Sequence, residues 1–174
     1  MWNPDLFYET LDFAAGAHEG QYVPGHNYSY VVHLYGVCME ALRAAMIEPA
    51  DSNLIMQCAL LHDTMEDTPI TLSILTDRFG SQVAEGVLAL TQQEGESTEN
   101  YLKKIVRQSK EIWMVKLADR IWNMHEPPEH WDLTKRKAYC GEAKVILETL
   151  KGGSPYLAAR LSDRIYAYNK FILP

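Results

Sequence analysis

The segment ALLHDTMEDT, residues 59–68, is the most informative stretch of the chain, because it places one histidine and three acidic residues within six positions, directly after an apolar run. Asp and Glu are rarely buried unless they are paired or bind a metal ion. A helix that leaves the core and ends in these groups therefore suggests a functional role. Taken alone, however, the segment is better explained as a helix end with exposed charges.

The spacing within this segment suggests two roles. His62 and Asp63 offer one nitrogen and one oxygen ligand from adjacent positions. Glu66 and Asp67 follow them by four residues, about one turn if the helix continues, so all four side chains are expected to share one cleft. Acidic groups that do not bind the metal are candidates to orient or deprotonate a water molecule. Glu66 and Asp67 are therefore candidates for this catalytic role.

A second apolar segment, IWMVKLADRIWN at residues 112–123, carries another buried acid. Asp119 is embedded among bulky apolar side chains, where an unpaired carboxylate would be costly. Lys116 and Asn123 lie about one turn before and after it, on the same helical face. Metal binding by Asp119 and an ion pair with Arg120 or another basic residue are equally good interpretations of this segment alone.

His33 lies on a third apolar stretch, YVVHLY at residues 30–35. A single histidine on an apolar helix is more often a hydrogen-bonded core residue than a metal ligand. Its combination with the other two segments changes that interpretation and favours a ligand.

Composition narrows the classes of protein. A chain of 174 residues with 47% hydrophobic content predicts one domain over residues 1–174. Cys38, Cys58 and Cys140 have no close spacing and are expected to be buried thiols of a reducing compartment. The formal charge of −7 argues against a nucleic acid polymer as partner. Without an apolar leader or membrane-spanning run, we expect a cytoplasmic protein with no membrane partner.

Helical periodicity runs through most of the chain and predicts an all-α fold of roughly seven to nine helices. Ser29, Ser52, Thr71 and Ser81 are expected at helix starts. The polar stretch between Leu90 and Tyr101 is expected to be a solvated connector rather than a lid. The expected helices are near residues 4–20, 29–46, 52–62, 71–79, after 81, 102–106, 111–124, 133–150 and 155–172.

The groups occur along the chain as His, then His-Asp, then a distant Asp. This order resembles the ligand order of the HD phosphohydrolase superfamily. More narrowly, the chain resembles the hydrolase domain of the RelA/SpoT alarmone enzymes and the stand-alone small alarmone hydrolases. The matching segments are AHEGQ (17–21), YVVH (30–33), ALLHDTMEDT (59–68), FGSQVA (79–84) and VKLADRIWN (115–123).

This resemblance implies a multi-helix HD domain with one divalent ion and a small-molecule nucleotide substrate. Mn²⁺ is expected rather than Zn²⁺, because imidazole and carboxylate ligands without thiolate suit a harder ion. Glu66 and Asp67 would position or activate the attacking water. The implied metal ligands are His33, His62, Asp63 and Asp119.

The resemblance also implies residues that bind the substrate. Asn123 would lie along the sugar or phosphate, and Lys135 and Tyr139 near the phosphates. A core aromatic is the alternative for Tyr139. The chain departs from the family after Gln21, where members usually carry a basic pair and this chain has the segment 22–24, Tyr-Val-Pro.

The leading hypothesis is metal-dependent hydrolysis of a nucleotide phosphate ester or pyrophosphate, with the 3′-pyrophosphate of a (p)ppGpp-like alarmone as the first substrate to test. One alternative is a nucleotide phosphatase that acts on a deoxynucleotide monophosphate or a dinucleotide cofactor. Another is a catalytically silent HD module that binds a nucleotide. The sequence leaves the oligomeric state open.

Overall fold

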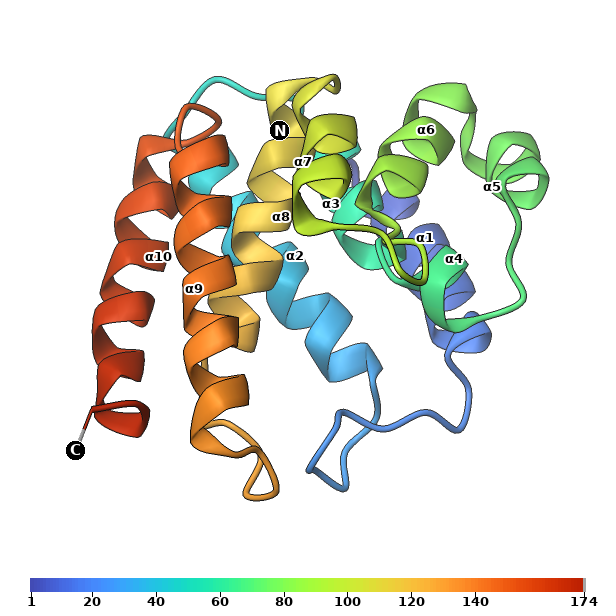
Figure 1. The fold of residues 1–174 in the computed structure, drawn as a ribbon. Helices are drawn as coiled ribbons and strands as arrows, with labels where there is room; N and C mark the ends of the chain where they lie inside the picture. Colours follow the sequence, from blue (N-terminus) through green and yellow to red (C-terminus); the bar gives the residue numbers. More distant parts are fainter. Residues whose placement is uncertain (174) are drawn as a thin grey trace.

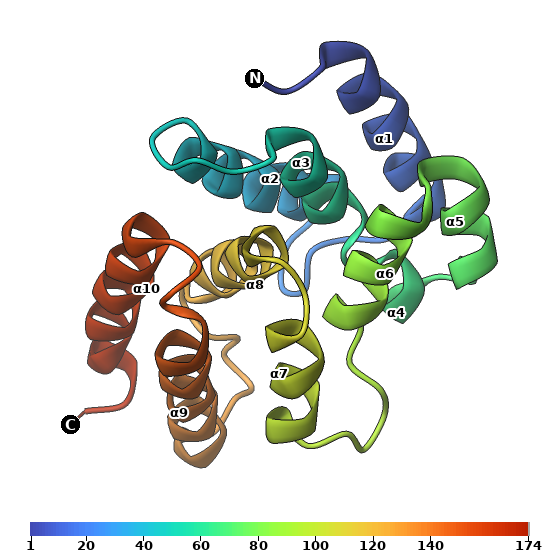
Figure 2. The ribbon, with the colours of Figure 1, turned by 90° about the horizontal axis from the view of Figure 1, so that it is seen from above.

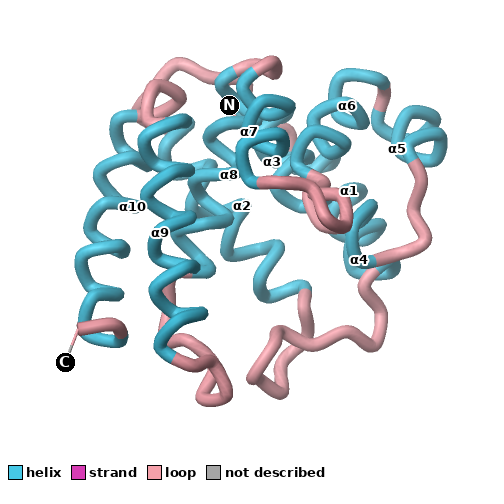
Figure 3. The backbone as a smooth tube through the Cα atoms, viewed as in Figure 1, coloured by secondary structure: helices cyan, strands magenta, loops and turns pink. Residues whose placement is uncertain are grey.

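The computed structural model describes residues 1–173 and shows a fold built from helices (Figures 1 and 3), which confirms the all-α expectation. The described residues form ten α-helices and one 3₁₀ helix, slightly more than expected, because a four-residue helix follows His62. The elements are α1 (Pro4–Ala17), α2 (Val31–Ala45), α3 (Ser52–Leu61), α4 (Thr64–Asp67), α5 (Leu72–Phe79), α6 (Ser81–Leu90), α7 (Thr98–Val106), α8 (Lys110–Asn123), α9 (Leu133–Leu150), α10 (Pro155–Tyr168) and η1 (Asn169–Phe171).

Capping side chains explain where several helices begin. The Asp51 side chain accepts from the backbone amides of the first turn of α3, so Asp51 caps this helix and Ser52 is its first residue. Ser97 accepts from the amide of Asn100, and α7 therefore begins about four residues before the expected start. The polar connector is accordingly shorter and ends at Ser97. The cap of α6 is Gly80 rather than a serine side chain.

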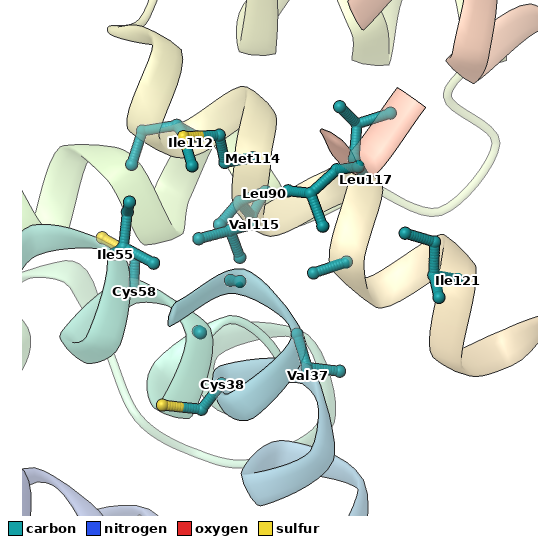
Figure 4. Packing of buried hydrophobic residues seen from close by; sticks show 14 of the residues in the cluster. Val37, Cys38, Ile55, Cys58, Leu90, Ile112, Met114, Val115, Leu117 and Ile121 are labelled. Atoms are coloured by element: carbon teal, nitrogen blue, oxygen red, sulfur yellow. The ribbon is translucent and has the colours of Figure 1, made fainter. Parts of the chain in front are cut away.

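Helix α8 occupies the centre of the molecule. It packs against α2 and α3 on one side and against α7, α9 and α10 on the other, as the view from above shows (Figure 2). Its apolar side chains meet those of α2, α3 and α6 in one continuous core (Figure 4). The three cysteines are buried free thiols, as expected. Because α8 also carries Asp119, the core fixes the position of that carboxylate.

No helix within residues 1–173 is both long and apolar enough to cross a membrane.

Candidate metal centre

The four expected ligands come together from three places in the fold. His33 lies on α2, His62 and Asp63 form the junction between α3 and α4, and Asp119 lies on α8. The Nε2 atoms of the two histidines are 3.2 Å apart. Asp63 Oδ2 lies 2.9 Å from Nε2 of His62 and 3.3 Å from Nε2 of His33. Asp119 Oδ1 lies 3.7 Å from each of the same nitrogens. Donor atoms of His33, His62 and Asp119 therefore lie close enough together to share one ion, and Asp63 lies beside both histidines.

The junction between α3 and α4 explains why adjacent residues can face one ion. Helix α3 ends at Leu61, and a new helical turn starts at Thr64, so the chain does not continue as the single helix that the spacing suggested. Thr64 Oγ1 donates to the carbonyl of Leu61 at 2.6 Å and ties the two helices together. His62 and Asp63 lie in this break, where both side chains turn toward the same point.

The histidines are buried and oriented. His33 is 3% exposed and His62 is 4% exposed. Nδ1 of His62 lies 2.8 Å from the carbonyl of Ala59, and a proton on Nδ1 satisfies this hydrogen bond. Nε2 then keeps its lone pair for a cation, which is the usual arrangement of a ligating histidine.

The charges of these groups depend strongly on one another. Burial alone would lower the pKa of His62, but Asp63 and Asp119 beside it raise this pKa to about 10. Burial alone would raise the pKa of Asp119, yet Lys116, His62 and His33 hold it well below its usual range. The two histidines likewise lower the pKa of Asp63 against the effect of burial. Both carboxylates are therefore ionised, and a cation would replace a proton shared among these groups.

This donor set fits a divalent metal ion. The nitrogens of His33 and His62 and an oxygen of Asp119 all lie within 4.8 Å of one another, and Asp63 Oδ2 lies beside both nitrogens. The set contains no thiolate, which suits an ion harder than zinc.

Each carboxylate also has hydrogen-bond partners outside the expected ligand set, and of these only Tyr30 was not indicated by the sequence. The Tyr30 hydroxyl donates to Asp63 Oδ2 at 2.6 Å. Lys116 Nζ donates to Asp119 Oδ2 at 2.8 Å, and Asn123 Nδ2 donates to Asp119 Oδ1 at 2.6 Å. Asp119 therefore has the ion pair of one interpretation and also faces the histidines, while metal binding by Asp119 stays a prediction. Spacing indicated Lys116, which lies three residues before Asp119 on the same helix, whereas Tyr30 contacts Asp63 from a distant part of the chain.

Arg120, the other suggested partner of Asp119, points elsewhere. Its guanidinium pairs with Glu142 of α9 at 3.1 Å and lies over the Tyr139 ring, 4.5 Å from the centroid. Arg120 therefore connects α8 to α9.

Glu66 and Asp67 lie on α4, next to the ligand set. Glu66 Oε2 accepts a hydrogen bond from the amide of Gln92 at 2.8 Å, which fixes the carboxylate at the start of the polar connector. The loss of surrounding water raises the pKa of Glu66, and the negative charge of Asp63 adds to the shift. The same two causes raise the pKa of Asp67. Both side chains still reach solvent, so they can exchange protons with it.

The three expected substrate-binding residues lie at increasing distance from this centre. Asn123 contacts Asp119 directly. The Tyr139 hydroxyl donates a long hydrogen bond of 3.4 Å to the Asn123 carbonyl, and its ring packs partly buried against the core. Lys135 is exposed, and its ammonium lies over the Trp131 ring, 4.6 Å from the centroid. The structure thus brings Asn123 into the centre and leaves Lys135 on the surface.

Comparisons with known proteins agree with this geometry. A family model described as HD domain matches residues 30–146. Guanosine-3′,5′-bis(diphosphate) 3′-pyrophosphohydrolase MESH1 of Homo sapiens is 30% identical over 162 residues, which cover 88% of this chain and 89% of the human protein. The protein of the same name from Danio rerio is 28% identical over 164 residues, 89% of each chain. A solved structure of a metazoan ortholog of SpoT that hydrolyses ppGpp has a TM-score of 0.84 at 24% identity over 99% of both chains, so it shares the fold.

Proposed function

The chain belongs to the HD domain family, and from this premise we propose that it is a metal-dependent hydrolase of the 3′-pyrophosphate of guanosine 3′,5′-bis(diphosphate). One observation carries the proposal: His33, His62 and Asp119 lie close enough to share a divalent metal, Asp63 lies beside both histidines, and two acidic residues with raised pKa values lie next to them. Relatives of similar length that carry this activity by name supply the substrate.

We propose that the residues which hold a single Mn²⁺ ion are His33, His62, Asp63 and Asp119. When bound, such an ion neutralises charge on the phosphoryl oxygens and makes a water molecule more acidic. The carboxylate partners Tyr30 and Lys116 would keep Asp63 and Asp119 oriented toward the ion whether or not substrate is present.

Glu66 and Asp67 would hold the attacking water and take its proton. A base is most effective when its pKa approaches the working pH, and the raised pKa values of both carboxyls move them in that direction. The water oxygen bonds to the phosphorus attached to the ribose 3′-oxygen, and the bond between that phosphorus and the 3′-oxygen breaks. The 3′-oxygen takes up the proton that the base removed from water and becomes a hydroxyl, while the two phosphoryl groups depart as pyrophosphate. The products are GDP and pyrophosphate.

We propose that Asn123 lies along the ribose or its phosphate, with Tyr139 and Lys135 beyond it. The contact of Asn123 with Asp119 supports this placement, because any group that approaches the ligand set from α8 meets Asn123. Lys135 lies at the start of α9, and its long side chain can leave the Trp131 ring to meet a phosphate.

We further propose that residues 1–174 act as one HD domain in the cytoplasm. The buried side chains of residues 1–173 form one hydrophobic cluster, which supports a single domain. Three buried free thiols are typical of a reducing compartment.

Product analysis tests the proposed reaction. Protein loaded with Mn²⁺ is incubated with guanosine 3′,5′-bis(diphosphate), with deoxynucleoside monophosphates and with a dinucleotide cofactor, and the products are separated by anion exchange. We expect equal amounts of GDP and pyrophosphate from the first substrate. Orthophosphate from only the other substrates would favour a phosphatase. Tight binding without any hydrolysis would favour a silent nucleotide-binding module.

A further inference from the structure

A groove of about 420 Å³ lies between α2, the C-terminal end of α8, and α10. These three helices pack together along one side of the molecule (Figures 1 and 2). The groove uses the exposed face of α2, where Val32 and Tyr35 reach solvent, whereas His33 points from the same helix into the metal centre. Its volume falls within the usual range of about 300 to 1,000 Å³ for small-molecule sites.

Aromatic side chains give the groove flat walls. Trp122, Tyr35 and Tyr156 line it, each from a different helix or its start. The Trp122 ring is held tightly, because a Cβ atom built at Gly36 would lie 1.9 Å from it. The glycine thus lets the indole lie directly against α2, where it forms a rigid surface for another ring to stack on.

Two arginines make the groove positive in a chain whose formal net charge is −7. Arg43 and Arg164 line the groove, and none of the ion pairs within residues 1–173 includes either of them. Arg164 Nε is buried without a hydrogen-bond partner. The one carboxylate in the wall, Glu40, is already bound by Arg160 through two hydrogen bonds of 2.8 and 2.6 Å. Two guanidinium groups therefore remain for an anion, and guanidinium matches phosphate especially well.

The neighbouring histidine adds hydrogen bonding without charge. His125 also lines the groove, with its ring 5.6 Å from that of Trp122. Burial, with Arg164 next, lowers the pKa of His125. Its neutral imidazole can accept or donate a hydrogen bond at neutral pH.

We propose that this groove is a second ligand site, separate from the metal centre, for a small molecule that combines an aromatic ring with a phosphate or diphosphate group. The ring stacks on Trp122, and the phosphates lie between Arg43 and Arg164. Trp122 also packs against His33, with 6.0 Å between the ring centroids, so one side chain separates the groove from a proposed metal ligand.

The tryptophan side chains provide the test. The probe is GDP, added to ¹⁵N-labelled protein loaded with diamagnetic Mg²⁺, and the indole N–H resonances are followed by NMR. Trp122 reports on the groove, and Trp131, beside Lys135, reports on the proposed substrate side. Trp113 is an internal reference, because its indole N–H is bound to the backbone carbonyls of Ile105 and Gln108.

We expect the Trp122 resonance to shift to saturation with GDP, and to require at least about tenfold higher concentrations of guanosine or inorganic pyrophosphate, each of which lacks half of the contacts. The double variant R43Q/R164Q should weaken this response about tenfold or more. The matched control R78Q/R107Q removes the same charge from outside the groove and should behave like the wild type. Because Arg164 is partly buried, the melting temperatures of both variants are measured to verify the fold.

Two results would overturn the proposal. In the first, GDP moves only the Trp131 resonance, or moves Trp122 equally in R43Q/R164Q and in the wild type. In the second, R43Q/R164Q keeps its fold but loses turnover, which would make the groove part of the catalytic site. A separate site predicts turnover within about twofold of the wild type, because distant independent sites act additively.

Discussion

The Tyr30 hydroxyl donates a hydrogen bond to Asp63 Oδ2 at 2.6 Å, which links the start of α2 to the junction that carries the His-Asp pair. The Tyr30 ring is itself held by stacking on His18, with 4.9 Å between the centroids. Because an outer partner fixes the orientation of a ligating carboxylate, Tyr30→Phe should weaken metal binding by about tenfold while the protein stays folded. Competition with a metal-binding dye measures the affinity.

Tyr28→Phe is the matched control, since Tyr28 stacks on His26 in the exposed loop and donates to no ligand. Equal metal affinity in Tyr30→Phe and Tyr28→Phe would show that the hydrogen bond to Asp63 does not position the ligand.

The pH dependence of catalysis should reflect the raised pKa values of Glu66 and Asp67. A general base works only when deprotonated, so kcat/KM falls as the pH drops through its pKa. Because partial burial raises both values, this fall should begin at a higher pH than for an ordinary carboxyl group, whose pKa is about 4. A pH profile of kcat/KM, with metal content measured at each pH, shows where this fall begins.

Metal loss must be separated from protonation of the base in this profile. If the fall of kcat/KM at low pH parallels the loss of bound metal, the fall reflects protonation of the metal ligands. The proposal that Glu66 or Asp67 is the general base then loses its support.

The contact between Gly36 and Trp122 predicts a destabilising substitution. A Cβ at Gly36 would meet the indole ring at 1.9 Å, so Gly36→Ala forces Trp122, and with it the His33 environment, to move. Overpacking of this kind costs typically about 1–3 kcal/mol. Thermal or urea unfolding measures the loss.

Gly141→Ala on α9 provides the comparison, because a Cβ there meets nothing within 4 Å. This variant should be neutral or slightly more stable, as expected for Gly to Ala within a helix. If Gly36→Ala were as stable as Gly141→Ala, the Trp122 ring would be able to move away from position 36 without a loss of stability.

The fold was largely predictable because the elements carry local signals. The predicted bounds of α9 agree with the structure, since Asp132 caps the helix and the prolines at 127 and 128 precede it. The early start of α7 was missed, because Thr98 to Tyr101 lie in a polar run that hides an amphipathic turn behind the Ser97 cap. Polar residues at a helix start thus concealed the boundary.

The site was predictable only in part, for a different physical reason. Chemistry and spacing pointed to the His-Asp pair and Asp119, and the structure brings them together with His33. The contact of Tyr30 with Asp63 depends on how the start of α2 packs against the junction between α3 and α4, which no local pattern encodes. The contact of Lys116 with Asp119 is local, because the two residues lie three apart on α8. The roles of Lys135 and Tyr139 stay predictions, because they depend on a bound substrate.

We propose that one set of residues binds the ion and that Glu66 and Asp67 act on the attacking water. Measuring the metal per chain by elemental analysis, together with pyrophosphate release, tests this division on three variants. His62→Ala and Asp63→Ala should lose both the metal and activity. Glu66→Gln should keep one ion per chain while turnover falls by roughly a hundredfold or more, as expected for loss of a general base. Full metal content in His62→Ala and Asp63→Ala, or unchanged turnover in Glu66→Gln, would contradict the account.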